Sequence, residues 1–150
     1  MSAPDCIILV GLPGAGKSTF YRQRLQSCTH ISKDSFPRHA RDKQARQDGA
    51  VRAALRAGRS IVVDNTNVTP ADRAAVISIA REFAARVICY YVDSTIRDAV
   101  ARNARREGRG KVPKVAIFTS AKKLVPPALS EGFDELHTVR ATADGMFWEE

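Results

Sequence analysis

The stretch CIILVGLPGAGKST, residues 6–19, joins an unbroken apolar run to a glycine-rich turn. Such a run is typical of a strand that is covered on both faces of a sheet. The turn GLPGAGKS, Gly11–Ser18, fits the pattern G-x-x-x-x-G-K-[ST] without a mismatch. Glycines in this pattern let backbone N–H groups point inward at an anion, and the start of the next helix adds a favourable partial charge. The stretch therefore predicts a phosphate-binding loop between a buried strand and a helix that begins near Lys17.

The same loop contains the first candidate site residues. In the pattern, the side chain of Lys17 reaches the β- and γ-phosphates of a nucleoside triphosphate, and the Ser18 hydroxyl ligates Mg²⁺. We therefore expect ATP or another nucleoside triphosphate as phosphoryl donor and Mg²⁺ as metal. The residues expected to bind the nucleotide are Gly11, Pro13, Gly14, Ala15, Gly16, Lys17, Ser18 and Thr19.

Short β-rich runs alternate with helical patterns along the rest of the chain. Strands are expected at residues 6–10, 30–32, 60–64, 86–93 and 135–139. Helices are expected from about residue 17, over 42–57 with Gly58 as the terminating residue, from Thr69 with Pro70 in the first turn, and after Asp93. The alternation predicts an α/β fold with a parallel sheet of about five strands and helices on both faces, and the phosphate-binding loop makes it one of the P-loop NTPase type.

The length and composition set the class of protein. A chain of 150 residues predicts a single domain over 1–150, and residues 1–4 and 141–150 are expected to be terminal tails. The net charge of +8 indicates a polyanionic partner. Three cysteines in or beside apolar runs, without metal spacing, favour reduced thiols and a cytoplasmic protein. The apolar run at the start is too short for a membrane span, so no membrane association is expected.

Two carboxylates follow expected strands at the edge where parallel sheets bind ligands. Asp64 ends an apolar strand and opens the polar run DNTN, Asp64–Asn67, which suits a metal ligand opposite the loop. Asp34 lies in ISKD after the second strand and is a candidate for the base that takes a proton from an attacking hydroxyl. The alternative for Asp64 is a cap of the next turn, and the alternative for Asp34 is a helix-start residue.

A stripe of arginines lies on the helix expected after Asp93. At about 100° per residue, one side of this helix gathers Ile96, Ala99, Val100, Asn103 and Ala104, and the other gathers Arg102, Arg105, Arg106 and Arg109. The helix is expected to break at Gly108 and Gly110. An arginine-rich segment that ends in a flexible turn suits a lid over phosphates, because arginine forks neutralise phosphoryl oxygens. The alternative is a solvated helix face.

The motifs GLPGAGKST, ISKD, VVDNTN, RNARR followed by KVP, and PPALSEGFDELHTV occur in this order. Together they resemble the kinase domain of the polynucleotide 5′-hydroxyl kinases over about residues 7–140. The resemblance implies that Lys17 and Ser18 bind phosphate and Mg²⁺ and that Asp34 is the general base. It further implies that Arg106 clamps the phosphates with Arg102 as a second candidate. Asp64 and Asn67 would lie near the metal and nucleotide, and Arg73 would follow them with a role still to be assigned.

The sequence departs from the family pattern in the segment that is expected to bind the acceptor phosphate. In KDSFPRHAR, Pro37 stands near the place of the expected arginine, and Arg38 and Arg41 are the nearby candidates. The sequence has no D-x-D-x-[TS] phosphatase signature, so the resemblance to kinase–phosphatases covers the kinase half alone.

The expected function is transfer of the γ-phosphoryl group of ATP to the 5′-hydroxyl end of DNA or RNA, as in nucleic-acid repair. Two segments, residues 33–59 and 97–114, each carry a net charge of +5, which suits a polyanionic acceptor. One alternative is a kinase for a small molecule or nucleotide sugar, and another is a nucleotide-binding switch without catalysis. The choice between DNA and RNA and the oligomeric state stay open at this point.

Overall fold

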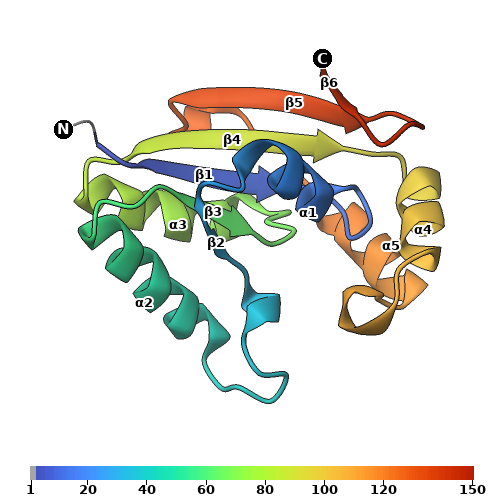
Figure 1. Ribbon diagram of the computed structural model, residues 1–150, viewed down its shortest axis with the longest axis horizontal. Coiled ribbons are helices and arrows are strands. Elements are labelled where there is room, and N and C mark those ends of the chain that lie inside the picture. Colours follow the sequence, from blue (N-terminus) through green and yellow to red (C-terminus); the bar gives the residue numbers. More distant parts are fainter. Residues whose placement is uncertain (1–2) are drawn as a thin grey trace.

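The apolar run at the start of the chain forms the centre of the sheet in the computed structural model, which describes residues 3–150 (Figure 1). β1 (Asp5–Val10) pairs in parallel with β3 (Ile61–Asp64) on one side and with β4 (Arg86–Asp93) on the other. β2 (Thr29–Ile31) and β5 (Glu135–Ala141) continue the parallel sheet outward, and β6 (Phe147–Glu149) pairs antiparallel with β5. The strand order is β2-β3-β1-β4-β5-β6.

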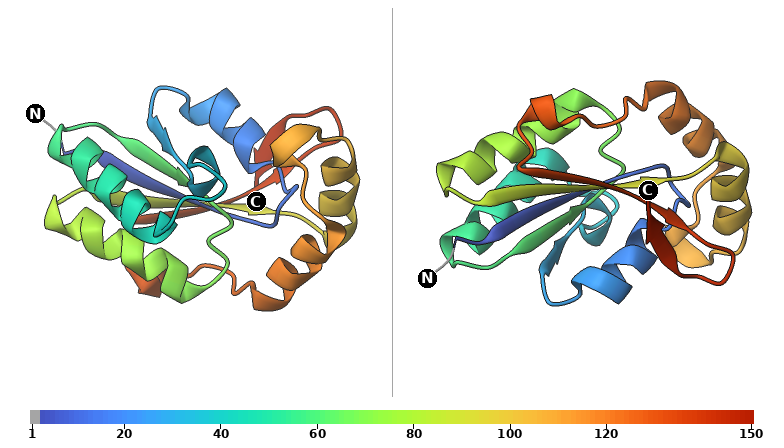
Figure 2. Two further views of the ribbon diagram at one scale, coloured as in Figure 1. Left: turned by 90° about the horizontal axis from the view of Figure 1, so that it is seen from below. Right: turned by 90° about the horizontal axis from the view of Figure 1, so that it is seen from above.

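Helices cover both faces of this sheet (Figure 2). Cys6, Ile8 and Val10 belong to the core formed with α2 (Lys43–Arg56) and α3 (Pro70–Glu82). Ile7 and Leu9 belong to the opposite core, with α1 (Lys17–Phe20) and the π-helical turn Tyr21–Leu25 that continues it. The strand is apolar at every position because side chains alternate between two buried faces. The α/β fold with helices on both faces, expected from the sequence, is confirmed.

The carboxyl ends of the parallel strands point toward α4 (Ile96–Ala104) and α5 (Lys114–Lys123), as Figure 1 shows. Three short 3₁₀ turns, Lys33–Ser35, Gly108–Gly110 and Leu129–Glu131, complete the connections. The first two of these turns and the loop after β1 lie at this edge, which is where ligands bind in sheets of this kind. The fold thus gathers the predicted motifs at one edge.

Local signals set several helix ends as expected. The Thr69 hydroxyl accepts a hydrogen bond from the Asp72 N–H at 3.1 Å, and Asp72 accepts one in return from the Thr69 N–H, which makes a capping box at the start of α3. Gly58, with φ 76°, follows the end of α2 in a left-handed conformation that glycine adopts without strain.

The expectation of a tail over 141–150 is wrong. Phe147 is 7% exposed and packs edge-on against Phe20 of α1, with the ring centroids 5.2 Å apart. The backbone of β6 pairs with the end of β5, so the sheet has a sixth strand and its only antiparallel pair in the described chain. Of the expected tail at 1–4, residues 1–2 lie outside the described part, and Pro4 accepts a hydrogen bond from the Arg86 N–H.

The expected apolar side of α4 is only partly correct. Ala99 and Asn103 are buried, but Ile96 and Ala104 are exposed. The helix ends at Ala104, so Arg105, Arg106 and Arg109 lie in the connection to α5 and do not share one helical stripe with Arg102. The buried amide of Asn103 exchanges two hydrogen bonds with the backbone of Val112, which offset the cost of its burial. These bonds also tie the connection to the helix.

The cysteines are all free, and burial raises the pKa of Cys6 and of Cys89 to about 12. These two thiols are therefore protonated near neutral pH and have little nucleophilic character. Over residues 3–150, none of the helices combines the length and the hydropathy that a bilayer crossing requires.

Candidate active site

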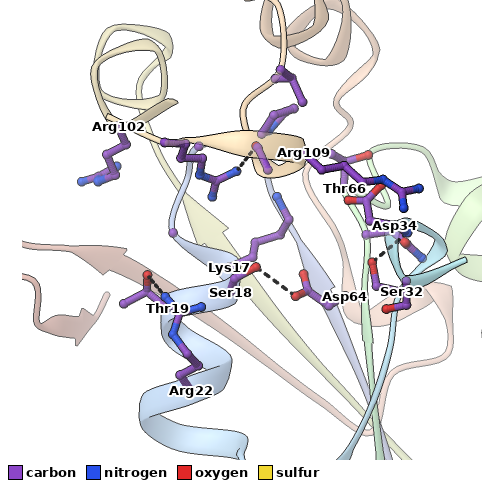
Figure 3. A pocket seen from close by; sticks show the side chains of 18 of the residues that line it. Lys17, Ser18, Thr19, Arg22, Ser32, Asp34, Asp64, Thr66, Arg102 and Arg109 are labelled. Carbon is purple, nitrogen blue, oxygen red and sulfur yellow. Dashed lines mark hydrogen bonds between the residues drawn. The ribbon is translucent and has the colours of Figure 1, made fainter. Parts of the chain in front are cut away.

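A cleft of about 800 Å³ opens at the carboxyl edge of the sheet (Figure 3). Four segments line it: the glycine-rich loop with the start of α1, the end of β3, the turn after β2, and the end of α4 with the connection to α5. These segments are distant in sequence and meet because the parallel strands all end at this edge.

The loop holds its shape through glycine. Gly14 and Gly16 have φ of 84° and 109°, in the left-handed region that favours glycine. A Cβ at Gly14 would collide with the carbonyl of Ala99 in α4, so the loop lies directly against that helix. The Gly11 N–H donates to the carbonyl of Thr66 at 3.0 Å, which fastens the loop to the segment after β3.

Lys17 is buried at the start of α1, and its Nζ donates to the carbonyls of Gly11 at 3.0 Å and Leu12 at 2.8 Å. Burial lowers the pKa of Lys17 from 10.5 to about 8. The carboxylates of Asp64 and Asp34 favour its charged form, and Arg106 opposes it. The Lys17 ammonium is therefore poorly solvated, and an anion in the loop would stabilise its charge.

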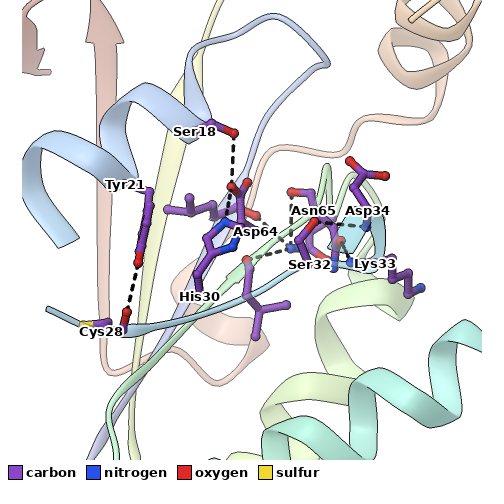
Figure 4. A network of polar contacts seen from close by, with 12 residues as sticks. Ser18, Tyr21, Cys28, His30, Ser32, Lys33, Asp34, Asp64 and Asn65 are labelled. Atoms are coloured by element: carbon purple, nitrogen blue, oxygen red, sulfur yellow. Dashed lines mark hydrogen bonds and ion pairs between the residues drawn. The ribbon is translucent and has the colours of Figure 1, made fainter. Parts of the chain in front are cut away.

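Asp64 lies at the end of β3 and faces the start of α1 (Figure 4). Its Oδ2 accepts a hydrogen bond from Ser18 Oγ at 3.3 Å and contacts His30 Nε2 at 2.8 Å. The His30 ring packs against Tyr21, with the ring centroids 4.6 Å apart. A hydroxyl and a carboxylate thus stand together beside the loop, and both are oxygen ligands of the kind that Mg²⁺ prefers.

Asp34 lies in the 3₁₀ turn after β2. Its backbone N–H donates to the Ser32 Oγ at 3.2 Å, which caps the turn, and its side chain is exposed to the cleft. The carboxylate makes no hydrogen bond to another described residue, so it is free to accept one from a ligand. Figure 3 shows Asp34 on the opposite side of the cleft from Arg102.

Four arginines line the cleft, Arg102 from the last turn of α4 and Arg105, Arg106 and Arg109 from the connection to α5. We call residues 102–112 the lid segment. Arg106 bonds to the carbonyl of Gly110 at 3.2 Å within the segment, and Arg109 reaches across the cleft to the carbonyl of Phe36 at 2.8 Å. The lid segment therefore touches the chain just after Asp34. It presents several guanidinium groups to a cleft that also contains Lys17.

Some predicted residues lie outside the cleft. Arg38 and Arg41 are exposed in the loop before α2 and do not line it, and Gly11 and Ala15 are buried behind it. Arg73 has no exposed surface, because it forms a bidentate pair with Glu131 at 2.8 and 2.9 Å and donates to the Asn67 carbonyl. Arg73, whose role the sequence left open, therefore lies outside the cleft, and its guanidinium joins α3 to Glu131 and to the backbone of Asn67.

Sequence reasoning missed several lining residues: Arg22, His30, Asn65 and Thr66. A signal existed for Asn65 and Thr66, which fall inside the polar run DNTN. His30 gave none, because its contact with Asp64 depends on the pairing of β2 with β3. Pairing between strands is a property of the fold and not of the local sequence.

The strand order, the glycine-rich loop and the cleft define a protein with the P-loop kinase fold. The family model described as "AAA domain" matches residues 6–126. The chain belongs to this AAA domain family, since the match covers most of its length.

Curated relatives confirm the resemblance to polynucleotide kinases. The chain is 27% identical over 140 residues to a bifunctional polynucleotide phosphatase/kinase of Schizosaccharomyces pombe, covering 90% of this chain and 33% of that protein. It is 28% identical over 143 residues to a putative bifunctional polynucleotide phosphatase/kinase of Acanthamoeba polyphaga mimivirus, with the same coverage of 90% and 33%. An L-seryl-tRNA(Sec) kinase of Methanococcus maripaludis is 27% identical over 85% of this chain and 55% of its own length. The chain spans about a third of the length of the first two relatives.

Solved structures share the fold. A chain of the Pnkp1/Rnl/Hen1 RNA repair complex has a TM-score of 0.70 at 23% identity, covering 83% of this chain and 45% of that one. A fungal RNA kinase has a TM-score of 0.72 at 14% identity, covering 93% and 39%. A gluconokinase from Sinorhizobium meliloti has a TM-score of 0.64 at 17% identity, covering 93% and 83%. At these identities the likeness extends to the fold alone.

Proposed function

We propose that this protein is a kinase that transfers the γ-phosphoryl group of ATP to the 5′-hydroxyl end of a DNA or RNA strand. The observation that carries this proposal is the single cleft shared by Lys17, Asp34 and the lid arginines. A donor phosphate in the loop and a hydroxyl beside Asp34 would face each other within it. Such an arrangement suits an in-line transfer between two bound substrates.

The proposed chemistry assigns one task to each group. Asp34 takes the proton of the attacking hydroxyl, whose oxygen forms the bond to the γ-phosphorus as the bond to the ADP oxygen breaks. Lys17 holds the β- and γ-phosphates, and Arg106 neutralises charge on the transferred group, with Arg102 as a second phosphate ligand.

The residues beside the loop fit Mg²⁺. Ser18 and Asp64 would hold the ion, and bound Mg²⁺ supplies positive charge that offsets the charge of the phosphates. Within residues 3–150 there is no cluster of three or more His, Cys, Asp or Glu side chains that could enclose a metal. This composition suits an ion bound largely through substrate phosphates, as is usual for Mg²⁺.

The choice of acceptor rests on the relatives and on charge. Two of the curated relatives are named as polynucleotide phosphatase/kinases, and the net charge of +8 favours a polyanion over a neutral sugar. The gluconokinase shares only the fold, and a fold does not fix the acceptor. A small-molecule acceptor is therefore the weaker candidate.

An acceptor panel tests the proposal. The protein is supplied with γ-labelled ATP, Mg²⁺ and either a 5′-hydroxyl oligonucleotide or a mixture of sugars and nucleosides. Label on the oligonucleotide supports the proposal. Label found only on a small molecule would overturn it, and nucleotide binding without any transfer would indicate a switch module.

A further inference from the structure

A second cavity, of about 250 Å³, adjoins the cleft at Asp34. Asp34, Asn65 and Thr66 line both spaces, whereas no residue of the glycine-rich loop lines the smaller one. A hydroxyl held by Asp34 would therefore have the phosphate donor on one side and this cavity on the other. Its volume lies below the roughly 300–1,000 Å³ of sites for whole drug-sized ligands, so it suits one part of an acceptor.

The orientation of one amide in the cavity wall is fixed by the backbone. The N–H of Lys33 donates to Asn65 Oδ1 at 2.9 Å, and because an N–H can only donate, this atom must be the amide oxygen. Asn65 Nδ2 is then a donor, and it bonds to Oε1 of Gln47 at 2.7 Å. Figure 4 shows Asn65 beside Ser32 and Asp34.

This bond in turn fixes the amide of Gln47. Gln47 lies on α2 and is 2% exposed, and its oxygen is already used by Asn65. Its Nε2 donates to no residue of the described chain, yet no fully enclosed side-chain nitrogen or oxygen there lacks a partner. Nε2 therefore reaches open space, and the space that Gln47 lines is this cavity. It is a preoriented donor without an acceptor.

Asn67 supplies a hydrogen-bond acceptor to the same cavity. Its Nδ2 donates to the carbonyl of Leu9 at 2.8 Å, which fixes Oδ1 as the acceptor. Asn67 is 5% exposed, lines the same cavity, and its Oδ1 accepts no hydrogen bond from residues 3–150. The cavity thus presents one fixed donor and one fixed acceptor. The carboxylates of Asp34 and Asp72 also line it together with Lys33, so the charged side chains of its wall carry a net negative charge that disfavours a phosphate.

We propose that this cavity binds the base of the acceptor's terminal nucleotide, with Gln47 Nε2 and Asn67 Oδ1 as its hydrogen-bond partners. This inference rests on the proposed function, because it places the acceptor hydroxyl at Asp34. Each nucleobase edge carries both donors and acceptors, and enzymes that hold an unpaired base bond to that edge. A donor and an acceptor that the protein leaves unpaired match such an edge, whereas an apolar group would leave both unsatisfied.

The test compares kcat/KM for two oligonucleotides with a 5′-hydroxyl, identical except that one lacks the base of its terminal nucleotide. Wild-type protein should use the abasic acceptor about tenfold less well, since both hydrogen bonds are lost. Gln47→Met should lower the ratio of kcat/KM for the full acceptor to kcat/KM for the abasic acceptor by several-fold. Gln26→Met is the matched control, because Gln26 is exposed and lines neither the cleft nor this cavity, so this variant should leave the ratio unchanged.

The ratio separates base binding from a structural role. If Gln47→Met slows both acceptors equally, Gln47 only holds Asn65 and the turn of Asp34, and the inference is wrong. Equal use of both acceptors by the wild type overturns it without any variant, while leaving the proposed function intact. Transfer to neither oligonucleotide would overturn the proposed function, and the inference with it.

Discussion

At the scale of the residue, Asp34 is the group on which the proposed reaction depends most. Its carboxylate is exposed to the cleft and is not engaged by another described side chain. Asp34→Asn should lower the transfer rate by about 10²- to 10⁴-fold, because the amide cannot accept the proton, while nucleotide affinity stays nearly unchanged. Single-turnover transfer and nucleotide titration measure the two effects.

The matched control is Asp42→Asn. Asp42 precedes α2, does not line the cleft and has φ 52°, a conformation that asparagine tolerates well. Wild-type turnover in Asp34→Asn would remove Asp34 as the base and make Asp64 the next candidate.

The depressed pKa of Lys17 predicts a pH dependence. Burial lowers this pKa to about 8, so raising the pH above that value discharges the ammonium in the free protein. Nucleotide affinity should then fall by up to about tenfold per pH unit, since one proton is linked to binding. Nucleotide titrations between about pH 7 and pH 9.5 measure this fall. Lys17→Met should bind more weakly and lose the dependence, and a flat wild-type profile would contradict the prediction.

The lowered pKa of Lys17 also affects folding: a rise in pH weakens nucleotide binding but favours the folded state. The unfolded chain keeps the Lys17 proton up to about 10.5, whereas the folded chain releases it near 8. Between these values the unfolded state binds more protons, so the contribution of Lys17 to the free energy of unfolding rises with pH.

At the scale of the element, the lid segment is proposed to act on the transferred phosphoryl group, whereas a solvated helix face would have no part in the reaction. Arg106→Ala should lower kcat by about 10³- to 10⁵-fold, with a smaller effect on nucleotide affinity, because its charge matters most as the phosphoryl group moves. Arg97→Ala, in α4 but outside the cleft, is the matched control and should have little effect. Equal small losses in both variants would indicate a solvated face.

The last strand, β6, contributes stability through one aromatic side chain. Phe147→Ala should lower the free energy of unfolding by about 3–5 kcal/mol, because it removes a buried ring that packs against Phe20. Trp148→Ala is the control within the same strand, since Trp148 is 50% exposed and should cost far less. Denaturant unfolding measures both changes, and equal losses would show that the packing of Phe147 is not what secures the strand.

The elements differ in how far the sequence predicts them. β4 has the bounds that RVICYYVD indicated, because the apolar run in this strand carries its own local signal. β6 has three residues and depends on pairing with β5, and α5 buries only Ile117, so neither has a strong local pattern. The C-terminal end of α4 also escaped prediction, because helical periodicity continues past Ala104 in the sequence although the helix does not.

The residues of the site also differ in how far the sequence predicted them. Lys17, Ser18, Asp34, Asp64 and Arg106 were expected to meet and do line one cleft, because motifs at strand ends converge in a parallel sheet. His30 and Gln47 were not expected, since their positions follow from strand pairing and helix packing. The structural role of Arg73 was not predicted, because its partner, Glu131, is far away in the sequence.

At the scale of the whole molecule, the charge distribution predicts how the acceptor binds. If several phosphates of a single strand contact the basic segments, the logarithm of its affinity should fall with the logarithm of salt concentration, by about 0.7 for each phosphate. Binding of a 5′-hydroxyl oligonucleotide at a series of salt concentrations measures this slope. A mononucleoside acceptor is the control and should show almost none, and a flat slope for the oligonucleotide would contradict polyanion binding.

The measurement that tests the central claim most directly is the location of the transferred group. The protein is given ATP, Mg²⁺ and an equal mixture of two oligonucleotides that differ only in a 5′-hydroxyl or a 5′-phosphate end, and the products are resolved by mass spectrometry. The proposed function predicts that the 5′-hydroxyl strand gains one phosphoryl group and that the 5′-phosphate strand gains none. Addition to both strands, or to neither strand, would contradict it.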